Sequence, residues 1–202
     1  MQTINNQSKK LTVRDLVTTG IFSAVFFVFT MIGGMFFVPN PVLTFVMPCA
    51  VALLTGPAYL LLVAKVPKHG PIIILGVLMG FLTFLTGMYW MWSIFYIVLS
   101  VIANFIAGTK SFKSMKLNIL SFLVFSMNPM GSYMMLWINK KNYFKYMVSK
   151  GAEQVYVNTM GTAAQGWMLP AMIISIIIAG LISAFIGKAM LKKHFEKAGM
   201  TA

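Results

Sequence analysis

The sequence contains very little charge. Only 9% of its 202 residues are charged and 59% are hydrophobic, whereas soluble domains carry about 25% charged residues. A surface facing water cannot be built from so few charged side chains, so the composition excludes an ordinary soluble protein. It predicts an integral membrane protein that contacts the lipid bilayer.

Groups that could do chemistry are equally scarce. Cys49 is the only cysteine, which excludes an internal disulfide and a cysteine-rich metal site. Asp15, Glu153 and Glu196 are the only acidic residues and lie far apart, so no carboxylate pair is expected to do acid–base work. There is neither an HExxH motif nor a GxxxxGK[ST] loop. We therefore expect no catalytic residue, metal or cofactor, and any use of ATP would require a partner. The chain is not expected to be an enzyme.

The net charge of +13 raises the question of nucleic acid binding. The basic residues are spread over short segments, and each segment flanks an apolar run. Membrane proteins use lysine and arginine in this way to fix their orientation. We therefore expect no nucleic acid partner.

Long uncharged runs define the fold class. They cover residues 16–64, 71–109, 117–139 and 154–187, and about 20 apolar residues cross the bilayer core. The sequence predicts an all-α bundle of six transmembrane helices that form a single domain over residues 1–202. The expected helices cover residues 12–38, 42–64, 71–88, 93–108, 117–137 and 167–190, with a short surface helix at 149–160 between the fifth and the sixth.

Prolines predict two irregular helices. Pro48 and the Gly56-Pro57 pair predict that the second helix is kinked or broken. Asn128-Pro129-Met130-Gly131 predicts an interruption in the fifth. In lipid, freed backbone groups need a neighbour or a cavity. Either break could therefore mark a binding cavity, although a structural kink is the more common reading.

The distribution of basic residues predicts the topology. With six helices and both termini in the cytoplasm, twelve of the 16 lysines and arginines lie inside. The other four, at 140–150, lie outside. Five helices would leave only half of them inside, so the positive-inside rule favours the N-in, C-in arrangement.

Small residues recur four apart on two expected helices, where they share one face. The pairs on the first helix are Gly20 with Ala24 and Thr19 with Ser23, and the last helix carries Ala179, Ser183 and Gly187. Such a face allows close helix packing in lipid. It could pack within the bundle or dock onto a separate membrane protein.

Aromatic residues gather at the expected outer ends. They form either an interfacial belt or the wall of a cavity for a flat, largely apolar ligand. The lysines at 140–150 are either solvated or attract an anionic ligand. The candidate ligand-binding residues are Asn40, Tyr89, Trp90, Trp92, Asn128, Tyr133, Trp137 and Asn139.

Three stretches carry a family resemblance: residues 10–21 (KLTVRDLVTTGI), 128–133 (NPMGSY) and 187–199 (GKAMLKKHFEKAG). In these stretches the chain resembles the substrate-binding (S) components of energy-coupling factor (ECF) transporters, of the MptD or Trep-Strep type. The resemblance implies a multi-pass protein of the bacterial plasma membrane with a pocket opening outward. The implied ligand is a vitamin or similar micronutrient.

The resemblance also implies partners, namely a transmembrane coupling subunit and two cytoplasmic ATPases. Gly20 and Ala24, with Thr19 and Ser23, match the small-residue motif that docks on the coupling subunit, with glycine in place of the first alanine. The alternative function is a self-contained secondary transporter or channel. The small size, the absence of charges within the spans and the lack of a repeat argue against it.

Overall fold

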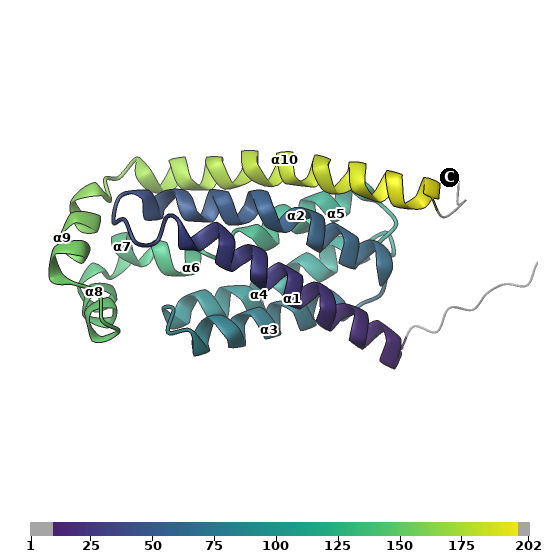
Figure 1. The fold of residues 1–202 in the computed structure, drawn as a ribbon, viewed down its shortest axis with the longest axis horizontal. Coiled ribbons are helices and arrows are strands. Elements are labelled where there is room, and N and C mark those ends of the chain that lie inside the picture. Colours follow the sequence, from purple (N-terminus) through teal and green to yellow (C-terminus); the bar gives the residue numbers. More distant parts are fainter. Residues whose placement is uncertain (1–9, 198–202) are drawn as a thin grey trace, which may run out of the picture.

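The computed structural model describes residues 10–197, with side-chain surroundings up to Lys192. Within this range helices are the only regular secondary structure, and there is no strand (Figure 1). The elements in order are α1 (Val13–Met35), the 3₁₀ helix η1 (Leu43–Val46), α2 (Met47–Lys65), α3 (Pro71–Leu85), α4 (Trp90–Gly108), α5 (Met115–Ser126), α6 (Met130–Tyr133), α7 (Met135–Ile138), α8 (Lys140–Ser149), α9 (Gln154–Ala163) and α10 (Met168–Lys197). The side chains of His194 and Glu196 lie outside the described part.

Five helical segments of the described chain are long and apolar enough to cross a membrane. They cover Val13–Met35, Leu43–Lys65, Trp90–Gly108, Met115–Ile138 and Met168–Lys192. The remaining apolar helix, α3, has only 15 residues, about 22 Å at 1.5 Å per residue. It ends three residues before the predicted boundary because a turn follows in which Gly87 has a φ of 79°. A sixth span through α3 stays a prediction.

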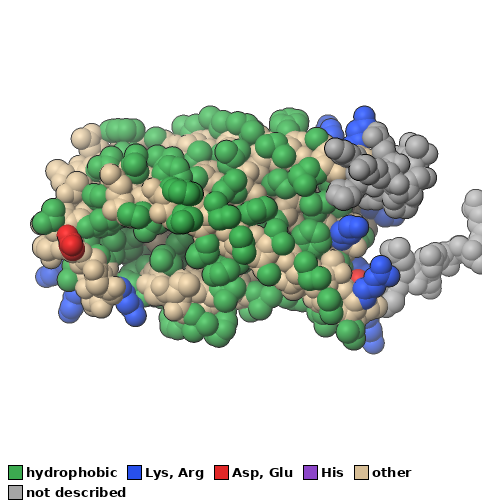
Figure 2. Space-filling view, in the orientation of Figure 1, with side chains coloured by type: hydrophobic (Ala, Val, Ile, Leu, Met, Phe, Trp, Pro, Cys, Tyr) green, Lys and Arg blue, Asp and Glu red, His purple; other side chains and the backbone are tan. Residues whose placement is uncertain are grey.

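Apolar side chains cover the outside of the bundle. Ile21, Phe81, Phe105 and Phe185 are all more than half exposed and come from four different helices. Figure 2 shows a broad hydrophobic belt between two ends where the basic side chains gather. A surface of this kind is unfavourable in water but suits hydrocarbon, so the exterior is that of a membrane protein.

Hydroxyl side chains lie inside the bundle. Several donate to the carbonyl oxygen four residues earlier in the same helix, over 2.8–2.9 Å. These donors are Thr19, Ser23, Thr30, Thr55 and Thr83. Because each hydroxyl is satisfied locally, small polar residues can pack between helices without a buried polar cost.

The proline pair of the second span does not break its helix. Pro48 lies in the first turn of α2, where a missing N–H costs nothing, and Pro57 lies within a continuous helix. Pro57 cannot donate to the carbonyl of Leu53. Ser183 of α10 donates to that oxygen instead, at 2.5 Å, and accepts from the N–H of Gly56 at 3.1 Å. A neighbouring helix therefore satisfies the freed group.

The small residues of α10 pack within the bundle. A Cβ on Gly180 would lie 2.7 Å from Leu123, and one on Gly187 would lie 2.9 Å from Leu60. Ser183 is fully buried beside them. Of the two readings of this face, the structure supports packing against α2 and α5.

The two ends of the bundle differ in what they contain. The end where α1 begins and α10 finishes, here called the terminal end, also holds the α2–α3 and α4–α5 connections (Figure 1). Asp15 closes a capping box with Thr12 and pairs with Lys68 at 2.8 Å, which ties α1 to the α2–α3 loop. The opposite end, here called the pocket end, carries α8, α9 and the lysines at 140–150.

The segment before α10 differs from its prediction. In place of one surface helix at 149–160, the structure has two, α8 and α9. The predicted helix runs across Gly151, whose φ of 98° ends α8 with a left-handed turn. The interruption of the fifth helix is confirmed, since α5 ends at Ser126 and α6 begins at Met130.

Candidate functional site

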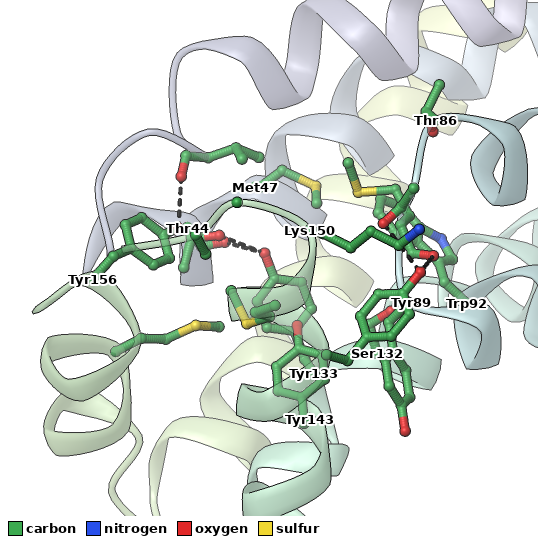
Figure 3. Close-up of a pocket in the computed structure, with 18 of the residues that line it drawn as sticks. Thr44, Met47, Thr86, Tyr89, Trp92, Ser132, Tyr133, Tyr143, Lys150 and Tyr156 are labelled. Carbon is green, nitrogen blue, oxygen red and sulfur yellow. Dashed lines mark hydrogen bonds between the residues drawn. The ribbon is translucent and has the colours of Figure 1, made fainter. Parts of the chain in front are cut away.

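A pocket of about 600 Å³ opens at the pocket end of the bundle. Its walls come from the α1–η1 connection, the start of α2, the α3–α4 turn and the start of α4, with α6, α8 and α9 completing them. Figure 3 shows these elements converging, and Figure 2 shows the surface hollowed at this end. The volume falls within the range of about 300–1,000 Å³ that holds small molecules.

The lining is mainly aromatic and sulfur-containing. Six aromatic side chains and four methionines face the pocket, and they come from both the bundle and the α8–α9 pair. They are Tyr89, Trp92, Tyr133, Tyr143, Tyr146, Tyr156, Met47, Met88, Met147 and Met160. Rings provide flat apolar walls, and methionine adapts its shape to the object it contacts. This lining fits a planar, largely apolar molecule.

The tyrosines from different elements pack edge to face. The Tyr89 ring lies 5.0 Å from the Tyr143 ring and 5.1 Å from the Tyr146 ring, at angles of 85° and 88°. These are favourable aromatic geometries. The cluster joins the start of α4 to α8 along one side of the pocket.

Hydrogen bonds hold two further aromatic walls. The indole N–H of Trp92 donates to the Asn128 Oδ1 at 2.6 Å, and the amide of Asn128 donates to the Phe125 carbonyl. The hydroxyl of Tyr133 lies 2.7 Å from both the Thr44 hydroxyl and its carbonyl oxygen (Figure 3). Since both partners are buried, these rings are fixed before any ligand arrives.

Two tyrosines fasten the α8–α9 pair over the pocket. Tyr146 of α8 donates to the carbonyls of Gly87 and Met88 at 3.3 and 3.2 Å. Tyr156 of α9 donates to the Val38 carbonyl at 2.6 Å (Figure 3). Burial raises the pKa of Tyr156, so its hydroxyl stays a neutral donor at physiological pH. These hydrogen bonds close the pocket on one side.

A few polar groups that line the pocket have no hydrogen-bond partner in the described part of the chain. The Ser132 Oγ is buried without a partner, and its residue is only 4% exposed. Lys150 and Glu153 also line the pocket, and no ion pair joins them. These groups are available to a ligand. The aromatic walls would hold its apolar body.

Three of the eight predicted ligand residues line this pocket, namely Tyr89, Trp92 and Tyr133. Asn128 lies behind the wall with both ends of its amide bonded. The other four predicted residues lie outside the lining. Asn40 caps the chain before η1, Asn139 caps α8, Trp90 is exposed, and Trp137 is partly buried on α7.

Nine of the 17 lining residues that the prediction missed lie on α8, on α9 and in the connection between them. Tyr143, Tyr146 and Met147 line the pocket from one face of α8, and Lys150, directly after the last residue of the helix, continues that face. Their spacing of three, four and seven residues is the helical repeat that places side chains on one face. The repeat was available in the sequence, but no helix was predicted over residues 140–148. The surface helix predicted at 149–160 overlaps α9, whereas α8 was not predicted.

The small residues of α1 divide between two faces. Thr19 and Ser23 are buried against the bundle, at 0% and 3% exposure. Gly20 and Ala24 are exposed. A Cβ added to Gly20 would meet nothing within 4 Å. Only Gly20 and Ala24 therefore belong to an outward surface that another membrane helix could approach.

Together, the apolar exterior, the buried hydroxyls and the pocket at one end define a multi-pass helical membrane protein with a small-molecule-sized cavity. The family comparison agrees with this class. Residues 13–197 match the family model described as hypothetical bacterial integral membrane protein (Trep_Strep), so the chain belongs to that family. Comparisons with curated proteins and with solved structures give no match.

Proposed function

We propose that this protein is the substrate-binding subunit of an ECF-type importer, which captures a vitamin or similar micronutrient outside the cell. The pocket of about 600 Å³ with its aromatic and methionine lining is the observation that carries the proposal. Its walls are fixed by internal hydrogen bonds, as in a preformed binding site. The resemblance of the three sequence stretches to S components supports the same function.

In the proposed orientation, the terminal end faces the cytoplasm and the pocket end faces outward. The basic residues at the terminal end support this orientation, because positive charge is retained on the cytoplasmic side. They include Lys10, Arg14, Lys65, Lys68, Lys110, Lys113, Lys116, Lys188 and Lys192. This orientation presents the pocket to solutes outside, and α3 serves as the sixth span.

The proposed partners are a transmembrane coupling subunit and two cytoplasmic ATPases. The exposed Gly20 and Ala24 support docking of the coupling subunit on α1, because small residues allow backbones to approach closely in lipid. The sequence has no phosphate-binding loop of its own. ATP hydrolysis is therefore assigned to the partners and no catalytic role to this chain.

Two variants separate docking from binding. Gly20→Leu and Ala24→Trp enlarge the outward face, so we expect them to abolish uptake in cells while the purified variants retain the wild-type ligand. Ile21→Leu, on the same exposed face, is the matched control and should transport normally. Native mass spectrometry identifies the retained ligand, and a radiolabelled form of it measures uptake.

Several outcomes would contradict the proposal. Loss of ligand from the Gly20 and Ala24 variants would mean that this face packs within the protein. Wild-type protein that retains no small molecule, and binds none from a micronutrient mixture, would remove the binding function. Uptake by this chain alone would favour a self-contained transporter or channel.

A further inference from the structure

We infer that the pocket selects a flat aromatic ligand carrying an anionic group, and that Lys150 binds this group. The inference rests on the proposed function, since it assigns a ligand class to the same pocket. The anionic group is a carboxylate or a phosphate, which share the chemistry that an ammonium recognises.

The charge at the pocket end favours an anion. Among the described residues there, the charged side chains are Lys140, Lys141, Lys145, Lys150 and Glu153. Positive side chains outnumber the single carboxylate, and the nearby wall is apolar. A low-dielectric wall focuses the field of the charges beside it. A negatively charged solute is therefore attracted to this opening and a positively charged one is repelled.

Of these lysines, only Lys150 reaches the pocket. Lys140 is already used, since its ammonium donates to the Gly161 carbonyl at 2.9 Å and lies over the Phe144 ring. The stem of Lys150 passes beside Gly87, with Cδ 3.9 Å from the position of a Cβ there. Figure 3 shows the side chain extending along the pocket toward Tyr89 and Trp92. The structure thus places one ammonium beside the aromatic wall.

The Lys150 ammonium keeps its charge available to a ligand. It lies 5.6 Å from the centre of the Tyr146 ring, and a cation over a ring face is held without being neutralised. No ion pair joins it to Glu153 in the described structure. Tyr146 is itself bonded to the α3–α4 turn, so the ring gives the ammonium a fixed support.

Ser132 gives independent evidence that the pocket is built for a ligand. Its Oγ has no hydrogen-bond partner, and the residue is 96% buried in the pocket wall. An unpaired buried hydroxyl costs stability. A polar atom on the ligand body would satisfy it, while the anionic group binds Lys150 and the ring lies on the aromatic wall.

The test uses three probes of the same shape and different charge. They are 2-naphthoate, 2-naphthamide and 2-naphthylmethylammonium, and isothermal titration calorimetry measures their binding to the purified full chain in nanodiscs. We expect the carboxylate to bind about tenfold more tightly than the amide, equivalent to about 1.4 kcal/mol. The ammonium should bind most weakly.

Variants assign the preference to one residue. Lys150→Gln should reduce the ratio of carboxylate to amide affinity to about one, and Lys150→Arg should restore most of it. Lys141→Gln removes an equal charge from the same end but outside the lining, so it should leave the ratio near its wild-type value. The amide affinity in Lys150→Gln reports whether the pocket itself has survived.

The inference is overturned if the amide or the ammonium binds wild-type protein as tightly as the carboxylate. It is also overturned if Lys150→Gln keeps the preference, or if none of the three probes binds. These results leave the proposed function standing as long as the wild-type protein retains another solute in native mass spectrometry. If the wild-type protein binds none of the three probes and also retains no solute in native mass spectrometry, the proposed function is contradicted as well.

Discussion

Replacing Ser183 of α10 with alanine should destabilise the bundle, because the Ser183 hydroxyl replaces the backbone donor that Pro57 of α2 lacks. Pro57 leaves the Leu53 carbonyl without its usual donor, and the Ser183 hydroxyl supplies one at 2.5 Å. The Ser183 hydroxyl oxygen also accepts from the Gly56 N–H at 3.1 Å. Hydrogen bonds between membrane helices average about 0.6 kcal/mol and reach about 1.7 kcal/mol. For two such bonds we expect a loss of about 1–2 kcal/mol in unfolding free energy.

The assay is a reversible unfolding titration with SDS in mixed micelles. Ser175→Ala is the matched control, because Ser175 lies on the same helix and bonds only to the Met172 carbonyl of its own helix. It should change the unfolding free energy by less than about 0.5 kcal/mol.

A double-mutant cycle tests the mechanism directly. In a Pro57→Ala background, the new N–H can donate to the Leu53 carbonyl within α2. Ser183→Ala should then cost about half as much as it does in the wild-type protein. An equal cost in both backgrounds would refute the claim that Ser183 compensates for the proline.

Three further predictions follow from the packing and the proposed orientation. Gly76→Ala should destabilise the protein by about 1–3 kcal/mol in the same titration. The reason is that a Cβ on Gly76 would lie 2.7 Å from the Tyr96 carbonyl oxygen and closer still to a serine side chain of α4. The control is Gly166→Ala, which should be neutral because a Cβ there meets nothing within 4 Å. Asn128→Ala leaves the buried indole N–H of the pocket tryptophan unpaired, so ligand affinity should fall several-fold, equivalent to about 1 kcal/mol, while Trp fluorescence changes. The orientation is tested with Lys145→Cys and Lys113→Cys in a background that lacks Cys49. Lys145→Cys should react with a membrane-impermeant maleimide on intact cells, whereas Lys113→Cys should react only after lysis. The reverse pattern would overturn the proposed orientation.

Charge and length predicted the positions of the apolar helices well. Helix ends depend on local signals, such as a capping residue or a glycine with positive φ, which hydrophobicity does not register. Thr12 closes the start of α1, and Gly87 and Gly151 adopt positive φ where α3 and α8 have ended. The prediction ran across both glycines, because hydrophobicity alone gives no weight to a turn.

Contacts between helices could not be predicted from one sequence. Thr19 and Gly20 are neighbours in the chain, yet one is buried and the other faces outward, because the rotation of α1 is set by the helices it packs against. Asn128 was one of the polar candidates for the ligand, but its amide oxygen accepts a hydrogen bond from Trp92. Such a partner 36 residues away becomes visible only once the fold is known.

The pocket lies at the meeting point of segments that are distant in the sequence. Its lining runs from Val38 to Met160, and only the residues at aromatic-rich helix ends were identifiable in advance. The α8 face could have been recognised by its helical spacing. The hydrogen bonds that Tyr146 and Tyr156 donate to distant carbonyls depend on tertiary structure alone.

Uptake into proteoliposomes tests the central claim most directly. The protein is reconstituted alone, or with the coupling subunit and ATPases of the same bacterium, and the ligand identified by native mass spectrometry is supplied outside. We expect ATP-dependent accumulation only with the complete module, and its loss in Gly20→Leu. Accumulation by the protein alone, without ATP, would show that it is a self-contained transporter and not the binding subunit of a larger importer.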